Sequence, residues 1–358
     1  MYMQYMFSSY FNFSHSNSGT STPTGRFFAS CAVLSSHEDG EAWATIFKFV
    51  KDLGVIPRFN MGDGAKAITL AGDEIFGGGS TTRLMCWAHV HAKILPRLKS
   101  VATHNKKVAD TILRDIENLQ WSALNEASFK KAFELLEKKY LGKHDLLLNG
   151  ALEIFFSYMH KVWIDSKEFR WFEGSNPWGP SNNQGIEGKN KEIKQSHTFR
   201  RRLEIGELLS VLARLVAEVS EDDDRLLVAP RTAVLHGERD SLSLRTGGYQ
   251  WFQANKTGTE KIIRIDTKNK YTVSEAFDLG KVENLWAVNS TVGLKSGTSL
   301  KERAKKRIKE RELPQSSTYD DYLDIRSSCW IIEERSGDFF CDCPVGMKVL
   351  YVYVKITY

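Results

Sequence analysis

The feature that most constrains the fold is an alternation of strand and helix patterns near the start of the chain. Arg26–Leu34 and Val55–Met61 are mainly apolar runs that predict buried strands, and Thr82–Trp87 predicts a third strand. Between them, Glu41–Leu53 has apolar residues at helical spacing, and Gly64–Phe76 is expected to form a second helix. This alternation predicts an α/β layer.

Changes in pattern divide the rest of the chain. We expect an irregular leader (1–24), the first part of the α/β core (25–97), an all-helical insertion (98–180), a core helix (181–220), a mixed linker region (221–325) and a C-terminal hairpin (326–358). Ala127–Tyr140 is the clearest helix of the insertion. The insertion ends at Asn176–Pro180, where proline and glycine interrupt the helical pattern.

Composition narrows the class of protein without choosing a function. A chain of 358 residues, 42% hydrophobic and 26% charged, is typical of a globular protein with two or three domains. A net charge of +5 is compatible with nucleic-acid binding but is weak support alone. The five cysteines follow no regular disulfide spacing, so we expect a reducing compartment. The N-terminus lacks the basic start of a signal peptide, and no stretch is long and apolar enough to span a membrane.

Asp63 and Glu187 are the candidate acidic site residues. Asp63 follows a predicted strand and precedes a glycine and a helix, and Glu187 lies near the start of a basic helix. Carboxylates placed in this way can hold two divalent cations, which activate water or a DNA 3′-hydroxyl. The alternative is that Asp63 only caps its helix and that Glu187 is a surface residue near a helix N-terminus. For either residue alone, this alternative is the stronger one.

Two further groups of residues accompany these carboxylates. Cys86 and His89 form a C-x-x-H motif directly after the third predicted strand. A structural zinc needs four ligands and no second pair lies nearby, so we favour packing or contact with a substrate strand over metal binding. Lys189, Lys194 and Arg200 follow Glu187 and could contact DNA phosphates, although an ordinary solvated basic face explains them equally well.

Taken together, the order and spacing of these motifs resemble the Mutator-like element (MULE) transposase family. The resemblance covers roughly Gly25–Leu215. Members of that family have an RNase H-like core with a DDE triad, a C-x-x-H motif after the second Asp, and a helical insertion before the Glu. The resemblance therefore implies an α/β fold with an RNase H-like core, a helical insertion and a small mixed C-terminal region.

The resemblance also implies roles for the candidate residues. Asp63 and Glu187 would be catalytic ligands of Mg²⁺ or Mn²⁺, and Cys86 and His89 would form the knuckle. Lys189, Lys194 and Arg200 would position the DNA backbone.

The family's first Asp lies upstream, on the first strand, where this chain differs. No Asp or Glu precedes Glu38, and we expect the corresponding place at Phe11–His15, where Asn12 or His15 could be only neutral ligands. Two metal ions held by two carboxylates would bind weakly. We therefore expect the catalytic activity to be impaired. We also expect the first strand of the core to be incomplete.

A second resemblance lies near the C-terminus. Phe340–Lys348 resembles the opening of a SWIM zinc finger, a module that follows the core in MULE-type proteins. Cys341 and Cys343 match its C-x-C pair, but no Cys or His follows Cys343. With two ligands of four, the Zn²⁺ site would be incomplete, and two free cysteines on a hairpin are favoured. Upstream, Lys301–Arg311 predicts a nuclear localisation signal, a nucleic-acid contact or a salt-bridged helix.

Three hypotheses remain open. The chain is a cut-and-paste DNA transposase, a non-catalytic nuclear DNA- or protein-binding module derived from one, or a fragmentary gene product. The missing first Asp and the incomplete finger favour the second and third hypotheses. We expect a nuclear or otherwise intracellular protein with DNA as partner, no membrane association and a homo-oligomer as an open alternative.

Overall fold

In the computed structural model, the chain folds into two compact units. It describes residues 2–8, 14–21, 27–35, 39–77, 79, 81–176, 181–182, 188, 191, 195, 203–221, 262–265, 282–290, 298–312, 315–335 and 338–343. Unit 1 consists of Met1–Ala92, Lys167–Trp171 and Gly179–Arg231, and unit 2 consists of Lys93–Ser166, Phe172–Trp178 and Thr232–Tyr358. The chain therefore leaves unit 1, builds helices in unit 2, and returns to unit 1 before completing unit 2.

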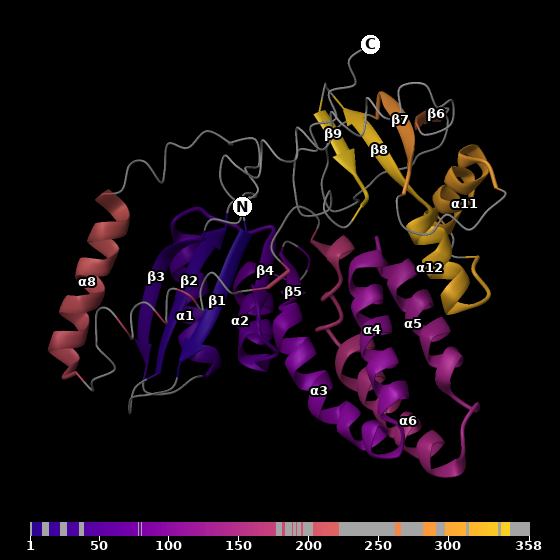
Figure 1. The fold of residues 1–358 in the computed structure, drawn as a ribbon. Helices are drawn as coiled ribbons and strands as arrows, with labels where there is room; N and C mark the ends of the chain where they lie inside the picture. Colours follow the sequence, from indigo (N-terminus) through magenta and orange to yellow (C-terminus); the bar gives the residue numbers. More distant parts are fainter. Residues whose placement is uncertain are drawn as a thin grey trace. The chain divides into compact units, whose positions relative to one another are not determined.

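Unit 1 contains a mixed sheet with the strand order β3-β2-β1-β4-β5 (Figure 1). The strands are β1 (Tyr2–Ser8), β2 (Ser14–Ser21), β3 (Phe27–Ser35), β4 (Phe59–Gly62) and β5 (Thr82–Met85). β2 is antiparallel to both β1 and β3, whereas β4 is parallel to both β1 and β5. The strands β1, β4 and β5 therefore share one direction, and their carboxyl ends lie at the same edge of the sheet.

Two helices of unit 1 pack against each other to form its described core. They are α1 (Gly40–Asp52) and α2 (Lys66–Phe76). The Asp39 side chain caps α1 by accepting a hydrogen bond from the backbone N–H of Ala42 at 3.0 Å. The apolar face expected from helical spacing is buried, and it consists of Trp43, Ile46, Phe47 and Val50. The prediction of this helix is confirmed. A further helix, α8 (Ile205–Glu221), lies beside β3.

The start of the chain differs from the sequence prediction. Residues 1–24 were expected to be an irregular leader, but β1 and β2 occupy most of this region. The prediction failed because β2 (SHSNSGTS) has no apolar alternation, and its strand conformation comes from pairing with neighbours on both sides. The first strand also lies earlier than expected, at Tyr2–Ser8. Residues 11–13 fall outside the described residues, and His15 belongs to β2.

The helical part of unit 2 begins within α3 (Trp87–His104). It continues through α4 (Lys106–Ser122), α5 (Glu126–Tyr140), α6 (Leu146–Met159), the π-helical turn η1 (His160–Ile164) and the short 3₁₀ helix η2 (Glu173–Ser175). Asn125 caps α5 by accepting a hydrogen bond from the Ser128 N–H at 2.8 Å. The helix predicted over Ala127–Tyr140 is confirmed. None of the described helices combines the length and the apolar character needed to cross a membrane.

The described residues after position 231 of the chain add an antiparallel sheet with two helices to unit 2. The strands β6 (Ile262–Ile265), β7 (Asn284–Asn289), β8 (Cys329–Arg335) and β9 (Asp338–Cys341) follow in this order across the sheet, and the helices are α11 (Leu300–Glu312) and α12 (Tyr319–Ser328). The pairing of β8 with β9 confirms the predicted C-terminal hairpin. The boundary predicted between residues 325 and 326 falls inside α12. The α/β class is thus observed, with most of the described structure helical.

Candidate functional site

Asp63 directly follows β4, the strand between β1 and β5, and is half-buried. Its Oδ1 accepts a hydrogen bond from the backbone N–H of Ala65 at 3.0 Å, one residue before α2. Asp63 therefore shapes the turn that leads into the helix, but it does not cap α2 as the alternative predicts, because the N-cap is Ala65 and has no side-chain cap hydrogen bond. Within the part of the chain that the structure describes, no hydrogen bond occupies its Oδ2. That oxygen is available to a cation.

The turn that carries Asp63 is held by Arg83, a buried residue of β5. Its Nη1 donates hydrogen bonds to the carbonyl oxygens of Asn60, at 3.4 Å, and Leu84, at 2.7 Å. Its Nη2 donates to the carbonyl oxygen of Asp63 itself. Its Nε donates to the Thr69 hydroxyl on α2, at 3.2 Å. One guanidinium thus joins β4, β5, α2 and the candidate site.

Gly62 makes room for this guanidinium. A Cβ at residue 62 would lie 3.1 Å from Nη1 and 3.3 Å from Nη2 of Arg83, closer than ordinary van der Waals contact. The sequence analysis missed both residues. The available signals were a basic residue inside a predicted strand and a glycine directly before the candidate carboxylate.

Cys86 and His89 lie where β5 passes into α3. Cys86 is fully buried, and its N–H donates a hydrogen bond to the carbonyl oxygen of Gly62 at 3.0 Å. Its own carbonyl accepts from the N–H groups of His89 and Val90, both at 3.2 Å, which begins the helix. His89 is half-buried on the first turn. The motif therefore connects the start of α3 to the turn that carries Asp63, and this supports the packing interpretation of Cys86.

Trp87, the residue after Cys86, contacts the third segment of the predicted site, which begins at Ser181. The N–H of Trp87 donates to the carbonyl oxygen of Ser181 at 2.9 Å. The Trp87 ring also stacks on Trp171, with ring centroids 5.3 Å apart and an interplanar angle of 18°. Next to it, the N–H of Met85 donates to the Arg170 carbonyl at 3.0 Å. The chain returning from the insertion therefore runs beside the end of β5.

Several predicted site residues fall outside the described residues. They are Asn12, Glu187, Lys189, Lys194 and Arg200. The pairing of Asp63 with Glu187 and the DNA contacts of the basic residues stay predictions. Among the described residues, no three or more His, Cys, Asp or Glu side chains are grouped so that they could hold a metal ion. Of the two carboxylates predicted to hold a divalent cation, Asp63 is thus the one that the structure describes.

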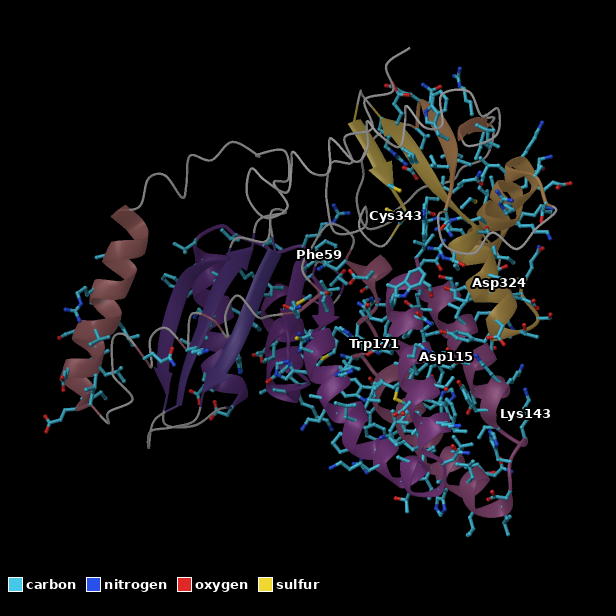
Figure 2. All side chains as sticks on the ribbon, viewed as in Figure 1. Phe59, Asp115, Lys143, Trp171, Asp324 and Cys343 are labelled. Carbon is cyan, nitrogen blue, oxygen red and sulfur yellow. The ribbon has the colours of Figure 1, made fainter. Side chains whose placement is uncertain are left out.

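The predicted zinc ligands lie in unit 2. Cys341 is buried at the end of β9, and Cys343 is half-buried (Figure 2). The Cys343 N–H donates to Cys341 Sγ at 3.4 Å. A hydrogen bond with the Cys343 side chain, together with burial, raises the pKa of the Cys341 thiol well above its usual value. In the absence of a metal, this environment therefore favours the protonated thiol of Cys341.

Asp342, between these cysteines, is a fully buried carboxylate. Its Oδ2 accepts a hydrogen bond from Arg307 Nε at 2.9 Å and lies 3.6 Å from Arg326 Nη1. Its Oδ1 accepts from the Ile331 N–H at 2.8 Å. Arg307 is completely buried, so the charged helix predicted over Lys301–Arg311 has one face packed inside the unit. The ion pair of Arg307 runs to a carboxylate outside the helix, so it does not test the expected pairing of the bases with the glutamates of the same helix.

Two comparisons with known proteins gave no match. No protein-family model matches the chain, and no curated protein matches it either.

Proposed function

We propose that the chain derives from a DNA transposase of the MULE type, and that unit 1 has a nuclease fold. Its ancestral chemistry would be metal-dependent cleavage and strand transfer of DNA. The observation that carries this proposal is the meeting of the three predicted site segments. The Cys86 N–H bonds to the Gly62 carbonyl, and the Trp87 N–H bonds to the Ser181 carbonyl. The knuckle therefore lies between the turn that holds Asp63 and the segment that leads to Glu187.

The strand order gives independent support. The sheet of unit 1 has the order β3-β2-β1-β4-β5, with β2 antiparallel to its neighbours and β4 parallel to β1 and β5, and such a mixed sheet is compatible with the RNase H-like core that the resemblance implies. In the MULE arrangement the second Asp belongs to such a core and the Glu follows a helical insertion. Here Asp63 follows β4, and the chain returns to unit 1 after the helices of unit 2.

The chemistry proposed for Asp63 follows from its hydrogen bonding. Ala65 fixes Oδ1, so Oδ2 would be the oxygen that holds a divalent cation. When bound, such a cation would activate a water or a DNA 3′-hydroxyl and stabilise the leaving oxygen. Glu187 would supply the second carboxylate.

A second candidate function is a non-catalytic DNA- or protein-binding module. The observation that favours it is the sequence of β1 (YMQYMFS), which contains no carboxylate although this strand lies directly beside β4. A site without the first Asp would hold two metal ions weakly. We therefore propose that catalysis is impaired while the transposase fold is kept.

A nicking assay tests the proposed function. The full chain would be incubated with labelled DNA in Mn²⁺ or Mg²⁺, beside Asp63→Asn, Glu187→Gln and the matched control Asp52→Asn, an exposed residue of α1. Transposase chemistry predicts that both site variants lose cleavage while the control keeps it. Equal cleavage by all four proteins would indicate contamination and would reject the enzymatic proposal.

DNA binding separates the two candidate functions. Affinity would be measured at several salt concentrations, because phosphate contacts make binding weaker as salt rises. Salt-dependent binding without cleavage would support the binding module. Neither binding nor cleavage would reject DNA as the partner.

A further inference from the structure

Arg83 is a buried cation that donates a hydrogen bond directly to the main chain of Asp63. Its hydrogen bonds to described residues include four to neutral oxygens, of which three are main-chain carbonyls and one is a hydroxyl. Burying a charged group costs free energy unless hydrogen bonds compensate, and an apolar residue would fill the same place at lower cost. The presence of an arginine in this strand therefore suggests a role other than core packing.

The geometry of the guanidinium indicates what this task is. The group is planar, with five N–H donors in a fixed fork. Nη1 binds carbonyls of both β4 and β5, and Nη2 reaches past the end of β4 to the carbonyl of Asp63. Nε binds Thr69, so α2 is fixed to the same plane. A lysine has a single nitrogen and cannot reach these diverging acceptors in the same way.

Asp63 is consequently fixed at two points. Arg83 holds its carbonyl, and the Ala65 N–H holds Oδ1 of its carboxylate. We propose that Arg83 is a positioning residue that fixes the β4–α2 turn and thereby orients the free carboxylate oxygen of Asp63 toward a cation. This inference rests on the proposed function. It adds a residue that would act through Asp63 rather than as a metal ligand, and on which the geometry of that ligand would depend.

Amide hydrogen exchange of the full chain tests the positioning directly. In Arg83→Met and Arg83→Lys, the Ala65 amide should exchange about tenfold faster than in the wild type, while the amides of the α1 core keep their protection. The matched control is Arg58→Met, which removes an exposed arginine just before β4. Unchanged Ala65 protection in both Arg83 variants, or an equal loss of protection throughout unit 1, would overturn the proposal.

A milder variant covers the case in which both Arg83 variants fail to fold. Thr69→Val removes only the acceptor of Nε and keeps the guanidinium in place. An increase in the exchange rate of the Ala65 amide over the wild type, larger than any increase in the α1 core, supports the proposal. Exchange identical to the wild type at Ala65 contradicts it.

Metal dependence provides a readout that a merely structural role would not move. In the nicking assay, Arg83→Lys should raise the Mn²⁺ concentration for half-maximal rate by about tenfold, with the rate at saturating Mn²⁺ less affected. Equal losses at all Mn²⁺ concentrations would overturn the positioning role. If the wild type shows no metal-dependent cleavage, the proposed function fails, and the exchange at Ala65 still decides whether Arg83 fixes the turn.

Discussion

Each unit buries arginine side chains, but the two units use them differently. In unit 1, Arg83 donates four hydrogen bonds to neutral oxygens of described residues around a turn. In unit 2, Arg307 and Arg326 both reach the carboxylate of Asp342. The first arrangement defines the path of the main chain beside a candidate ligand. The second holds packed elements together.

The partners of Asp342 explain this second role. Arg307 belongs to α11, Arg326 to α12, and Asp342 follows β9, so one carboxylate joins two helices to the C-terminal hairpin. Arg326 Nε also donates to the carbonyl oxygen of Ser122 at the end of α4, at 2.6 Å. This network links the helical insertion to the C-terminal sheet within unit 2. Stability should therefore depend on Asp342 more strongly than on any residue around Asp63.

The largest expected effect is that of Asp342→Asn. The substitution removes the negative charge shared by two buried guanidinium groups, and breaking a buried pair in this way costs roughly 3–5 kcal/mol. Urea denaturation would measure the free energy of unfolding. The control is Asp324→Asn on the exposed side of α12 (Figure 2), which should change stability by less than about 0.5 kcal/mol. Equal stability of the two variants would show that the buried network contributes nothing.

A smaller effect is expected in unit 1, from Gly62→Ala. The new Cβ would lie 3.1 Å from Arg83 Nη1 and 3.2 Å from Ile68 Cδ1, and such overpacking costs about 1–3 kcal/mol. Gly40→Ala is the matched control, because a Cβ there meets no atom within 4 Å. Denaturation of both variants would measure the difference.

Combining Gly62→Ala with Arg83→Met sharpens the comparison. Because the second substitution removes the guanidinium that the new Cβ would meet, the double variant should be more stable than the sum of the two single effects predicts. Strict additivity would mean that Gly62 and Arg83 do not depend on each other. The turn would then be held by other contacts.

The predictable parts of unit 1 are those with local causes. Helix α1 could be predicted because Trp43, Ile46, Phe47 and Val50 repeat at helical spacing, and one buried face requires that repeat. Asp63 could be placed for a similar reason, since an apolar strand, a glycine and a helix succeed one another around it. Each of these signals lies within a few residues of the feature that it predicts.

The parts that could not be predicted depend on distant segments. The polar strand β2 forms because it pairs with β1 and β3. The sequence of β2 does not reveal either partner. Arg83 was missed because a basic residue in a short strand usually indicates a solvent-exposed face. Its burial becomes favourable only when carbonyl groups of β4 and a hydroxyl of α2 surround it. Hydrogen-bond partners of this kind become known only with the fold.

The smallest expected effect concerns the partly exposed ion cluster around His160. It contrasts with the buried cluster around Asp342 in the same unit. His160 Nε2 lies 3.2 Å from Glu137 Oε2, and Nδ1 lies 3.1 Å from Asp165 Oδ2. Partial burial opposes the charged ring, but the hydrogen bonds to Glu137 and Asp165 outweigh it and raise the pKa of His160 above its usual value. The protonated ring therefore stabilises the folded state.

This stabilisation should depend on pH in one direction. Because the folded-state pKa is raised, it is fully present below the pKa of the unfolded chain and is lost as pH rises through the folded-state pKa. The wild type should exceed His160→Gln in stability at acidic pH by less than about 1 kcal/mol, since solvent screens such pairs, and the difference should shrink at alkaline pH. Denaturation at several pH values would measure it, with His144→Gln as the control. A difference that stays constant or grows with pH would mean that packing of the ring, rather than its charge, stabilises η1.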